Sequence, residues 1–222
     1  MFNRIARRYD VMNGLMTFGR HQAWRQEAAR LAEPRPGSLA LDAATGTGDL
    51  ARALLLESGV RGVVGLDFSE PMLFLGELKA KRLGIRTRLH FVAGDALALP
   101  FPDRTFSCVT SAFLLRNLVD LDQGLREMTR VTERGGRVVA LETSTPTLPG
   151  FRSLFALYFH RVVPLLGGLV AGDRDAYHYL PRTASRFPPP DDLARAMRTA
   201  GLREVSYRRL ALGTVAIHVG VV

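Results

Sequence analysis

The stretch LDAATGTGD, residues 41–49, lies between a short apolar run and a helical pattern. Gly46 and Gly48 allow the backbone to turn tightly and to approach a ligand closely. A loop of this kind, which follows a strand and opens a helix, is typical of nucleotide-binding α/β proteins. The stretch therefore predicts a nucleotide-type ligand at the end of the first strand of a sheet.

Strand-like and helix-like patterns alternate on both sides of this loop. Expected strands span 38–43, 60–66, 87–93, 105–112 and 137–142, and expected helices span 20–33, 49–58, 70–83, 118–133 and 191–200. Gly84 and Gly135-Gly136 are expected to end two of these helices. Residues 203–210 and 214–221 alternate like an antiparallel hairpin. The order predicts an α/β fold with a mostly parallel seven-stranded sheet, an antiparallel last strand and helices on both faces.

Composition limits the classes of protein to which the chain can belong. The 222 residues are 47% hydrophobic and 23% charged, enough for one domain with a sizeable core. Cys108 is the only cysteine, which excludes a disulfide framework and a cysteine zinc site. The five histidines are dispersed, so no metal site is expected. The net charge of +9 comes from scattered arginines, so no nucleic acid partner is expected.

Three acidic residues follow successive expected strands, and a fourth opens a helix. Asp42 and Asp49 flank the loop, where their charge would repel a pyrophosphate and attract a cationic amine. Asp67 is placed to bind both hydroxyls of a ribose, and Asp95 to bind an adenine amino group. S-adenosylmethionine has these groups and no phosphate. The pattern predicts a class I S-adenosylmethionine-dependent methyltransferase with a Rossmann-like sheet; a NAD-dependent oxidoreductase is the remote alternative.

We expect one methyltransferase domain over 1–222. A helical cap (1–35) precedes the cofactor-binding core (36–143); a substrate-cap insertion (144–190) and a closing helix with strands (191–222) follow. Residues 148–170 are mostly apolar, but Arg152 and Arg161 make a membrane span costly. We expect a cap helix that lines a lipid-tail channel or rests on a bilayer, with an ordinary core helix as the alternative. Because no signal peptide is recognised, a cytoplasmic location is expected.

Short motifs throughout the chain match one known family. They are FNRIARRYDVMN (2–13), AATGTGD (43–49), VGLDFSEPM (64–72), GDALALPFPD (94–103), LRN (115–117), LREMTRV (125–131), LETSTP (141–146), Tyr179-Leu180 and Arg186-Phe187. With these motifs the chain resembles, from end to end, the UbiE/MenG family of quinone C-methyltransferases. The glycine loop and LPFPD are shared by many methyltransferases, whereas RYD-VMN and LRN in this spacing are specific to the family.

The resemblance implies methylation of a ring carbon of a polyprenylated quinol. One branch converts demethylmenaquinol to menaquinol, the last step of menaquinone biosynthesis. The alternatives are a 2-methoxy-6-polyprenyl-benzoquinol in ubiquinone biosynthesis and another small acceptor. The stretch LETS (141–144) favours the menaquinone branch. A lipid-like substrate also implies peripheral contact with the inner face of the cytoplasmic membrane, and a homodimer is one oligomeric state that the sequence leaves open.

The resemblance further implies the residues of the site. The expected cofactor-binding residues are Asp42, Gly46, Thr47, Gly48, Asp67, Phe68, Asp95, Ala96 and Ala112. The expected catalytic residues are Arg116, Asn117 and Tyr9. Arg116 is expected to stabilise a phenolate-like oxygen, because arginine stays protonated, and Asn117 to hydrogen-bond a ring oxygen.

Three further expectations concern the surroundings of that site. Asp10 and Asn13 join Tyr9 in a group expected to close over the site. His160, His178 and Tyr177 are alternative proton acceptors. Leu114 stands where the family usually has glycine, so we expect a side chain that cannot easily keep a positive φ and that adds bulk near the methyl-transfer site.

Overall fold

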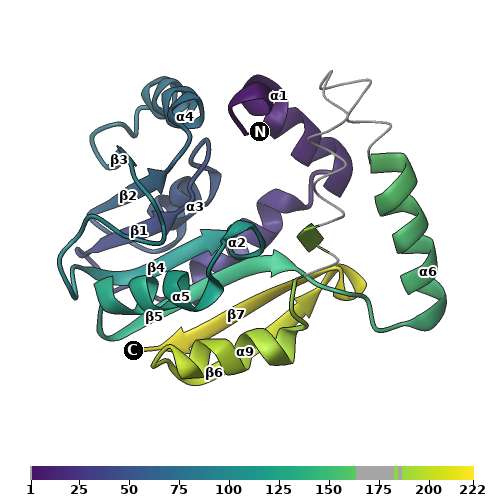
Figure 1. Cartoon of the computed structure of the whole chain (residues 1–222). Coiled ribbons are helices and arrows are strands. Elements are labelled where there is room, and N and C mark those ends of the chain that lie inside the picture. Colours follow the sequence, from purple (N-terminus) through teal and green to yellow (C-terminus); the bar gives the residue numbers. More distant parts are fainter. Residues whose placement is uncertain (1, 164–182, 185–186) are drawn as a thin grey trace.

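The computed structural model describes residues 2–163, 183–184 and 187–222 (Figure 1). Its strands are β1 (Leu39–Ala43), β2 (Gly62–Asp67), β3 (Leu89–Ala93), β4 (Phe106–Ala112), β5 (Thr132–Thr143), β6 (Arg203–Leu210) and β7 (Val215–Val221). They form a single seven-stranded sheet in the order β3-β2-β1-β4-β5-β7-β6. β7 runs antiparallel to both of its neighbours, β5 and β6, and all other neighbouring pairs in this sheet are parallel. The predicted fold class is confirmed.

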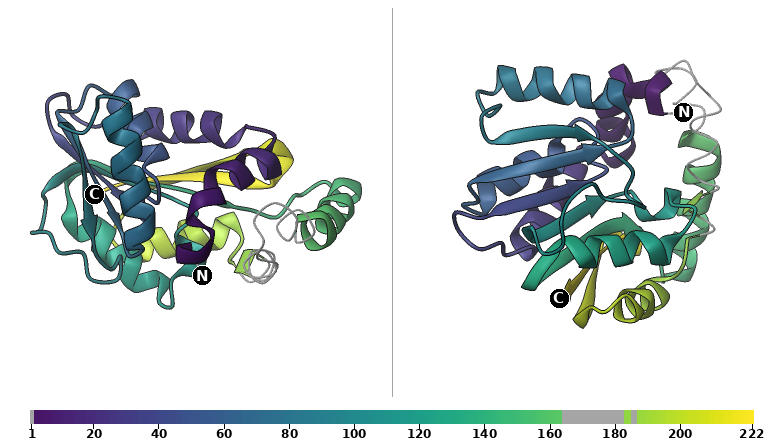
Figure 2. Two further views of the ribbon diagram at one scale, coloured as in Figure 1. Left: turned by 90° about the horizontal axis from the view of Figure 1, so that it is seen from above. Right: turned by 60° about the vertical axis from the view of Figure 1, so that its left-hand side comes forward.

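The described helices cover both faces of this sheet (Figure 2). They are α1 (Phe2–Thr17), α2 (His21–Leu31), α3 (Asp49–Glu57), α4 (Glu70–Arg82), the 3-10 turn η1 (Leu115–Asn117), α5 (Leu121–Val131), α6 (Pro149–Leu157), the π-helical turn η2 (Tyr158–Val162), α9 (Pro190–Thr199) and the short turn η4 (Ala211–Gly213). Leu125 and Met197 place α5 and α9 against one face. Ala28 and Leu54 place α2 and α3 against the other.

The chain order reverses at β1, which pairs in parallel with β2 on one side and with β4 on the other. Connections leave such a pair in opposite directions, so a crevice opens at the carboxyl ends of the two strands. In β1 the alternate residues Leu41 and Ala43 pack into one core cluster, and Ala40 packs into the other. The strand is thus buried on both faces, and the loop that follows it has a rigid base.

The boundary between α5 and β5 differs from the prediction. The helix ends at Val131 and the strand begins at Thr132, so Gly135-Gly136 lies inside the strand rather than after the helix. Gly135 has a φ of 76°, and a Cβ on Gly136 would lie 2.5 Å from the carbonyl oxygen of Ser107. The glycine pair therefore serves a close approach of β5 to β4 at an irregularity in their register.

The first described part of the 144–190 region lies apart from the sheet. Figure 1 shows α6 beyond the end of β5 that leads into it. The hydroxyl of Tyr158 donates to the carbonyl oxygen of Met16 at 3.1 Å, which links η2 to the end of α1. No helix in the described ranges is long and apolar enough to cross a membrane. Tyr177 and His178 lie outside the described residues.

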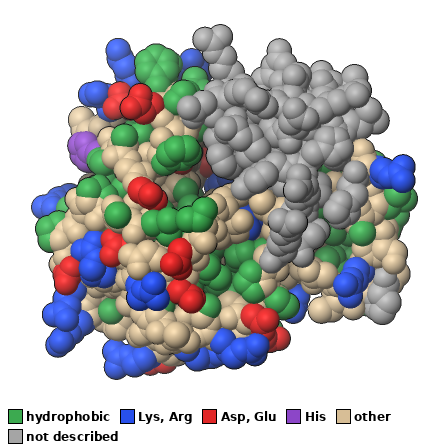
Figure 3. Space-filling model, viewed as in Figure 1, with side chains coloured by type: hydrophobic (Ala, Val, Ile, Leu, Met, Phe, Trp, Pro, Cys, Tyr) green, Lys and Arg blue, Asp and Glu red, His purple; other side chains and the backbone are tan. Residues whose placement is uncertain are grey.

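Charged side chains are mixed on the face of the molecule drawn in Figure 3. Basic side chains lie among acidic and apolar ones over the described part of that face. The excess of arginine in the sequence is therefore not gathered into one patch there.

Candidate active site

The glycine loop follows β1 and is anchored to β2. The backbone N–H of Gly46 donates to Oδ2 of Asp67 at 2.8 Å, and that of Thr45 donates to the carbonyl oxygen of Leu66 at 2.9 Å. Gly46 and Gly48 have φ values of 57° and 83°. A Cβ on Gly48 would come within 3.0 Å of the Phe91 ring, so glycine is needed there for both conformation and space.

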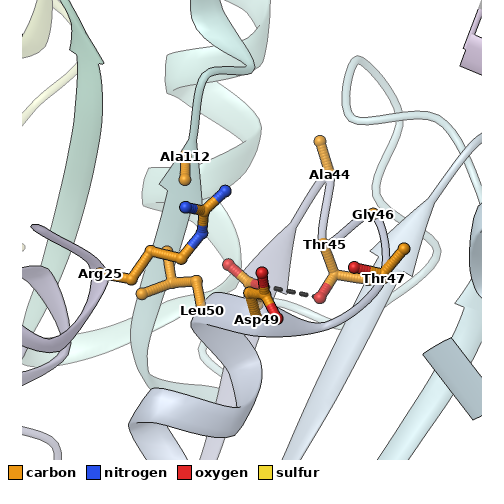
Figure 4. Close-up of a pocket in the computed structure, with 9 residues that line it drawn as sticks. Arg25, Ala44, Thr45, Gly46, Thr47, Asp49, Leu50 and Ala112 are labelled. Atoms are coloured by element: carbon orange, nitrogen blue, oxygen red, sulfur yellow. Dashed lines mark hydrogen bonds between the residues drawn. The ribbon is translucent and has the colours of Figure 1, made fainter. Parts of the chain in front are cut away.

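A pocket lies beside this loop (Figure 4). It is lined by Arg25, Asp42, Ala44, Thr45, Gly46, Thr47, Asp49, Leu50 and Ala112. These residues come from α2, β1 with its loop, α3 and the end of β4. The structure therefore brings four of the predicted cofactor residues to one cavity at the switch point, namely Asp42, Gly46, Thr47 and Ala112. Asp67 does not line the cavity but holds Gly46 from the neighbouring strand.

Asp42 is buried beneath the loop, with 1% of its surface exposed. Its Oδ2 accepts from the Thr45 hydroxyl at 2.7 Å and from the Ala51 N–H at 3.1 Å, and its Oδ1 accepts from the Thr110 hydroxyl at 2.9 Å. Burial raises the pKa of Asp42 to about 6, against the opposing effect of these hydrogen bonds. Asp42 thus ties the loop to α3 and β4.

Replacing Asp42 with Asn should change how stability depends on pH. Because folding raises the pKa of Asp42, the folded state holds its proton more tightly, and the associated stability is present below about pH 4 and lost as the pH rises through about 6. We expect the free energy of unfolding of the unsubstituted protein, relative to Asp42→Asn, to fall by about 3 kcal/mol over that range. Denaturant unfolding at several pH values measures this difference. The exposed Asp122→Asn is the control, and a difference that stays constant with pH would contradict the burial of a titrating Asp42.

Asp67 and Asp95 lie at the ends of neighbouring strands, as predicted. Asp67 is half-buried, and its Oδ1 accepts from the Ser69 N–H at 2.8 Å. Burial raises the pKa of Asp67, and the backbone donors oppose that shift. Asp95 is exposed and accepts from the Leu97 N–H at 2.9 Å through Oδ1 only. Phe68, beside Asp67, is 75% exposed, so an aromatic face is open to a ligand here.

The N-terminal helix reaches this loop. The Thr47 hydroxyl donates to Oδ1 of Asp10 in α1 at 2.9 Å, and Lys79 Nζ in α4 donates to Oδ2 of Asp10 at 3.0 Å. Lys79 also forms an ion pair with Asp49. Burial alone would raise the pKa of Asp49, but Lys79 holds it below its usual value. Asp10 thus contacts the glycine loop, whereas of Tyr9 the structure describes the backbone in α1 and not the side chain. That Tyr9, Asp10 and Asn13 close over the site as a group stays a prediction.

Arg116 forms a buried ion pair with Glu142 near the end of β5. The Nη1–Oε2 distance is 2.8 Å, and the two side chains are 7% and 1% exposed. The Nε of Arg116 is buried with no hydrogen-bond partner among the described residues. The guanidinium also lies 5.1 Å from the centroid of the Phe113 ring. Asn117 donates from Nδ2 to the carbonyl oxygen of Phe113 at 2.9 Å and so holds the turn.

The expectation that Leu114 would have to keep a positive φ is wrong. Its φ is −87°, in the right-handed helical region, and it is 8% exposed among core residues. The positive φ of the turn, 61°, belongs to Phe113. A leucine therefore fits position 114 without backbone strain, because its side chain packs into the core.

Sequence reasoning missed several residues of this region, and two of them matter most for the proposed chemistry. Arg25 lines the pocket from α2, and Glu142 holds Arg116. Glu142 is part of the LETSTP motif. That motif was recognised in the sequence, but the contact of Glu142 with Arg116 was not predicted. Arg25 carries no local signal, because an arginine in an amphipathic helix is usually a solvated side chain.

The residues fit S-adenosylmethionine better than they fit a dinucleotide. Asp67 and Asp95 present carboxylate oxygens, which accept hydrogen bonds from ribose hydroxyls and an adenine amino group. A pyrophosphate at the start of α3 would meet the buried Asp49 and the nearby Asp42. The basic residues at this place, Arg25 and Lys79, lie on α2 and α4, and Lys79 is already paired.

Comparison with known proteins shows the family of the chain. The model of the ubiE/COQ5 methyltransferase family matches residues 1–222. The demethylmenaquinone methyltransferase of Bacillus cytotoxicus is 45% identical over 222 residues, 100% of this chain and 93% of that protein. The demethylmenaquinone methyltransferase of Roseiflexus castenholzii is 46% identical over 221 residues, which cover 100% of this chain and 91% of that protein. The solved structure of an S-adenosylmethionine-dependent methyltransferase from Thermotoga maritima is similar in fold, with a TM-score of 0.67 and 18% identity over 99% and 97% of the chains. The chain belongs to the ubiE/COQ5 methyltransferase family.

Proposed function

We propose that this chain transfers a methyl group from S-adenosylmethionine to a ring carbon of demethylmenaquinol, which yields menaquinol. The observation that carries the proposal is the full-length match to relatives named for demethylmenaquinone, at 45% and 46% identity. The acid-lined switch point beside the glycine loop supports the same donor. S-adenosylmethionine supplies a methyl group that is bonded to a sulfonium. After the transfer, the sulfur remains in a neutral thioether, which is the leaving group.

The proposed donor site follows the strand order β3-β2-β1-β4. Asp95 and Ala96, after β3, bind the adenine, and Asp67, at the end of β2, binds the ribose hydroxyls. Gly46, Thr47 and Gly48 approach the middle of the ligand, Phe68 covers the adenine side, and Ala112 leaves room at the end of β4. Asp42 acts through the loop that it holds, because its carboxylate oxygens are all engaged by the protein.

The proposed chemistry needs an electron-rich ring carbon. A hydroquinone carbon becomes a good nucleophile when the neighbouring hydroxyl gives up its proton. Arg116 stabilises the resulting oxyanion with the part of its guanidinium that Glu142 does not engage, and Asn117 orients the ring. The carbon–methyl bond forms as the sulfur–methyl bond breaks. The ring carbon then loses its own proton to water, which restores aromaticity, and the phenolate oxygen takes up a proton from water to give the quinol. Tyr9 remains a predicted neighbour of this site.

A side-by-side assay of acceptors tests the proposed substrate. Labelled S-adenosylmethionine is offered with chemically reduced demethylmenaquinone, or with reduced 2-methoxy-6-polyprenyl-benzoquinone of the same prenyl length. We expect kcat/KM at least tenfold higher for the naphthoquinol, a difference of about 1.4 kcal/mol. The reverse preference would assign the chain to ubiquinone biosynthesis, and no label on either ring would point to another small acceptor.

We further propose that α6 places the protein on the membrane surface that holds the prenyl tail. Leu154 and Leu157 on this helix are 63% and 59% exposed. Arg152 in α6 and Arg161 in η2 are also exposed. Apolar side chains with adjacent arginines suit the boundary of an anionic bilayer. Phe18, which directly follows α1, is a further exposed apolar side chain, at 83%.

Replacing Leu154 and Leu157 together with Gln should weaken membrane binding. Each substitution removes an apolar side chain that would be buried in the interface, so we expect about tenfold less sedimentation with phosphatidylglycerol vesicles. The control is Leu56→Gln on α3, a leucine that is 67% exposed on another helix. Equal sedimentation of the double variant and the unsubstituted protein would rule out α6 as the membrane contact.

A further inference from the structure

Arg25 is a buried cation at the side of the pocket. It extends from α2 and is 5% exposed. Its Nη1 donates to Nδ1 of His21 at 2.8 Å and to the carbonyl oxygen of His21 at 3.1 Å. In Figure 4 its guanidinium points into the cavity, toward Ala112 at the end of β4. His21 thus fixes one edge of the guanidinium and leaves the other edge toward the cavity.

Arg25 has no counterion in direct contact. No carboxylate oxygen of the described residues lies within 4.0 Å of its nitrogens, and His21 is the only one of these residues to which it donates a hydrogen bond. The two nearby acids are engaged elsewhere: Asp42 by three protein donors, and Asp49 by Lys79 and Gln22. A buried guanidinium without a paired anion is costly, so its position is best explained by an anionic group that the pocket receives.

We propose that Arg25 binds the carboxylate of the methionine part of S-adenosylmethionine. The inference rests on the proposed donor site and adds the residue that recognises its amino-acid end. With adenine at β3 and ribose at β2, the methionine part extends past β1 toward β4, where Arg25 and Ala112 lie. A guanidinium is suited to this group because it donates two parallel hydrogen bonds to a carboxylate.

The same position could instead be explained by the acceptor. The ring of Phe113 lies 5.7 Å from the Arg25 guanidinium and 5.1 Å from that of Arg116. Phe113 thus lies close to both cations. Because Arg25 lines the cavity and Arg116 is not among its lining residues, we assign the donor carboxylate to Arg25 and the ring oxygen to Arg116.

A comparison of two donor ligands tests this assignment. The affinities of S-adenosylmethionine and of its decarboxylated form are measured by calorimetry for the unsubstituted protein and for Arg25→Gln. We expect Arg25→Gln to lower the affinity for S-adenosylmethionine about 30-fold and the affinity for the decarboxylated ligand less than twofold. The unsubstituted protein should bind S-adenosylmethionine more tightly than its decarboxylated form by a similar factor. Arg30→Gln is the matched control, since Arg30 is on the same helix but 57% exposed and paired with Glu57.

Other results of these affinity measurements would assign a different role to Arg25. Equal weakening of both ligands would overturn the proposal and leave Arg25 a support of the loop. An unchanged donor affinity with a raised KM for the quinol would place Arg25 at the acceptor. Should Arg25→Gln fail to fold, Arg25→Lys must retain a preference for the carboxylate ligand, and loss of that preference overturns the proposal. If the unsubstituted protein binds neither ligand, the proposed donor itself is wrong.

Discussion

Replacing Asp67 with Ala should weaken the binding of S-adenosylmethionine by about 100-fold. In the proposed donor site the carboxylate accepts hydrogen bonds from both ribose hydroxyls, and bonds to a charged group contribute about 1.5–3 kcal/mol each. Because the carboxylate also anchors the N–H groups of Gly46 and Ser69, part of the loss comes from a looser loop. Calorimetric titration with the donor measures the effect.

Two further variants separate these contributions. Asp67→Asn keeps one oxygen that can accept from the loop, so we expect an affinity between that of Asp67→Ala and that of the unsubstituted protein. Glu70→Gln removes an exposed carboxylate three residues later and should leave the affinity unchanged. Binding by Asp67→Ala within twofold of the unsubstituted protein would reject the ribose assignment.

Replacing Arg116 with Met should lower both turnover and stability. Loss of one oxyanion donor typically costs about 100- to 1000-fold in kcat. Removing one partner of a buried ion pair costs about 3–5 kcal/mol, because Glu142, which is 1% exposed, would keep an uncompensated charge. We expect the affinity for S-adenosylmethionine to change by less than threefold. Steady-state kinetics and denaturant unfolding measure the two effects separately.

A double variant distinguishes catalysis from support of the fold. Arg116→Met with Glu142→Gln removes both charges, while the amide oxygen of Gln can still accept from the N–H of Thr143, now 3.0 Å from Glu142 Oε2. We expect it to recover most of the lost stability and none of the lost turnover. If turnover returned together with stability, Arg116 would be a structural residue and the oxyanion assignment would be wrong.

Much of the fold and of the donor site could be predicted because both depend on local patterns. Strand periodicity placed Asp42, Asp67 and Asp95 at strand ends, and parallel strands bring their carboxyl ends to one edge. The glycine loop lies between β1 and α3 as expected, since its positive φ values require residues without a side chain.

The remaining features depend on contacts that no local pattern records. Arg25 reaches the pocket because α2 packs beside the loop. Glu142 reaches Arg116 because β5 lies next to η1. Leu114 was misjudged because the positive φ falls one residue earlier, on Phe113. The Gly135-Gly136 pair resembles a helix end in sequence, but it serves the close packing of two strands.

Methyl transfer to demethylmenaquinone with and without a chemical reductant tests the central claim most directly. The oxidised ring is electron-poor and cannot attack the methyl donor, whereas the quinol can. We expect label from S-adenosylmethionine on a ring carbon, shown by a product heavier by one methylene, only when the reductant is present. Equal labelling of the oxidised quinone, or label on an oxygen of the ring, would contradict carbon methylation assisted by a stabilised phenolate.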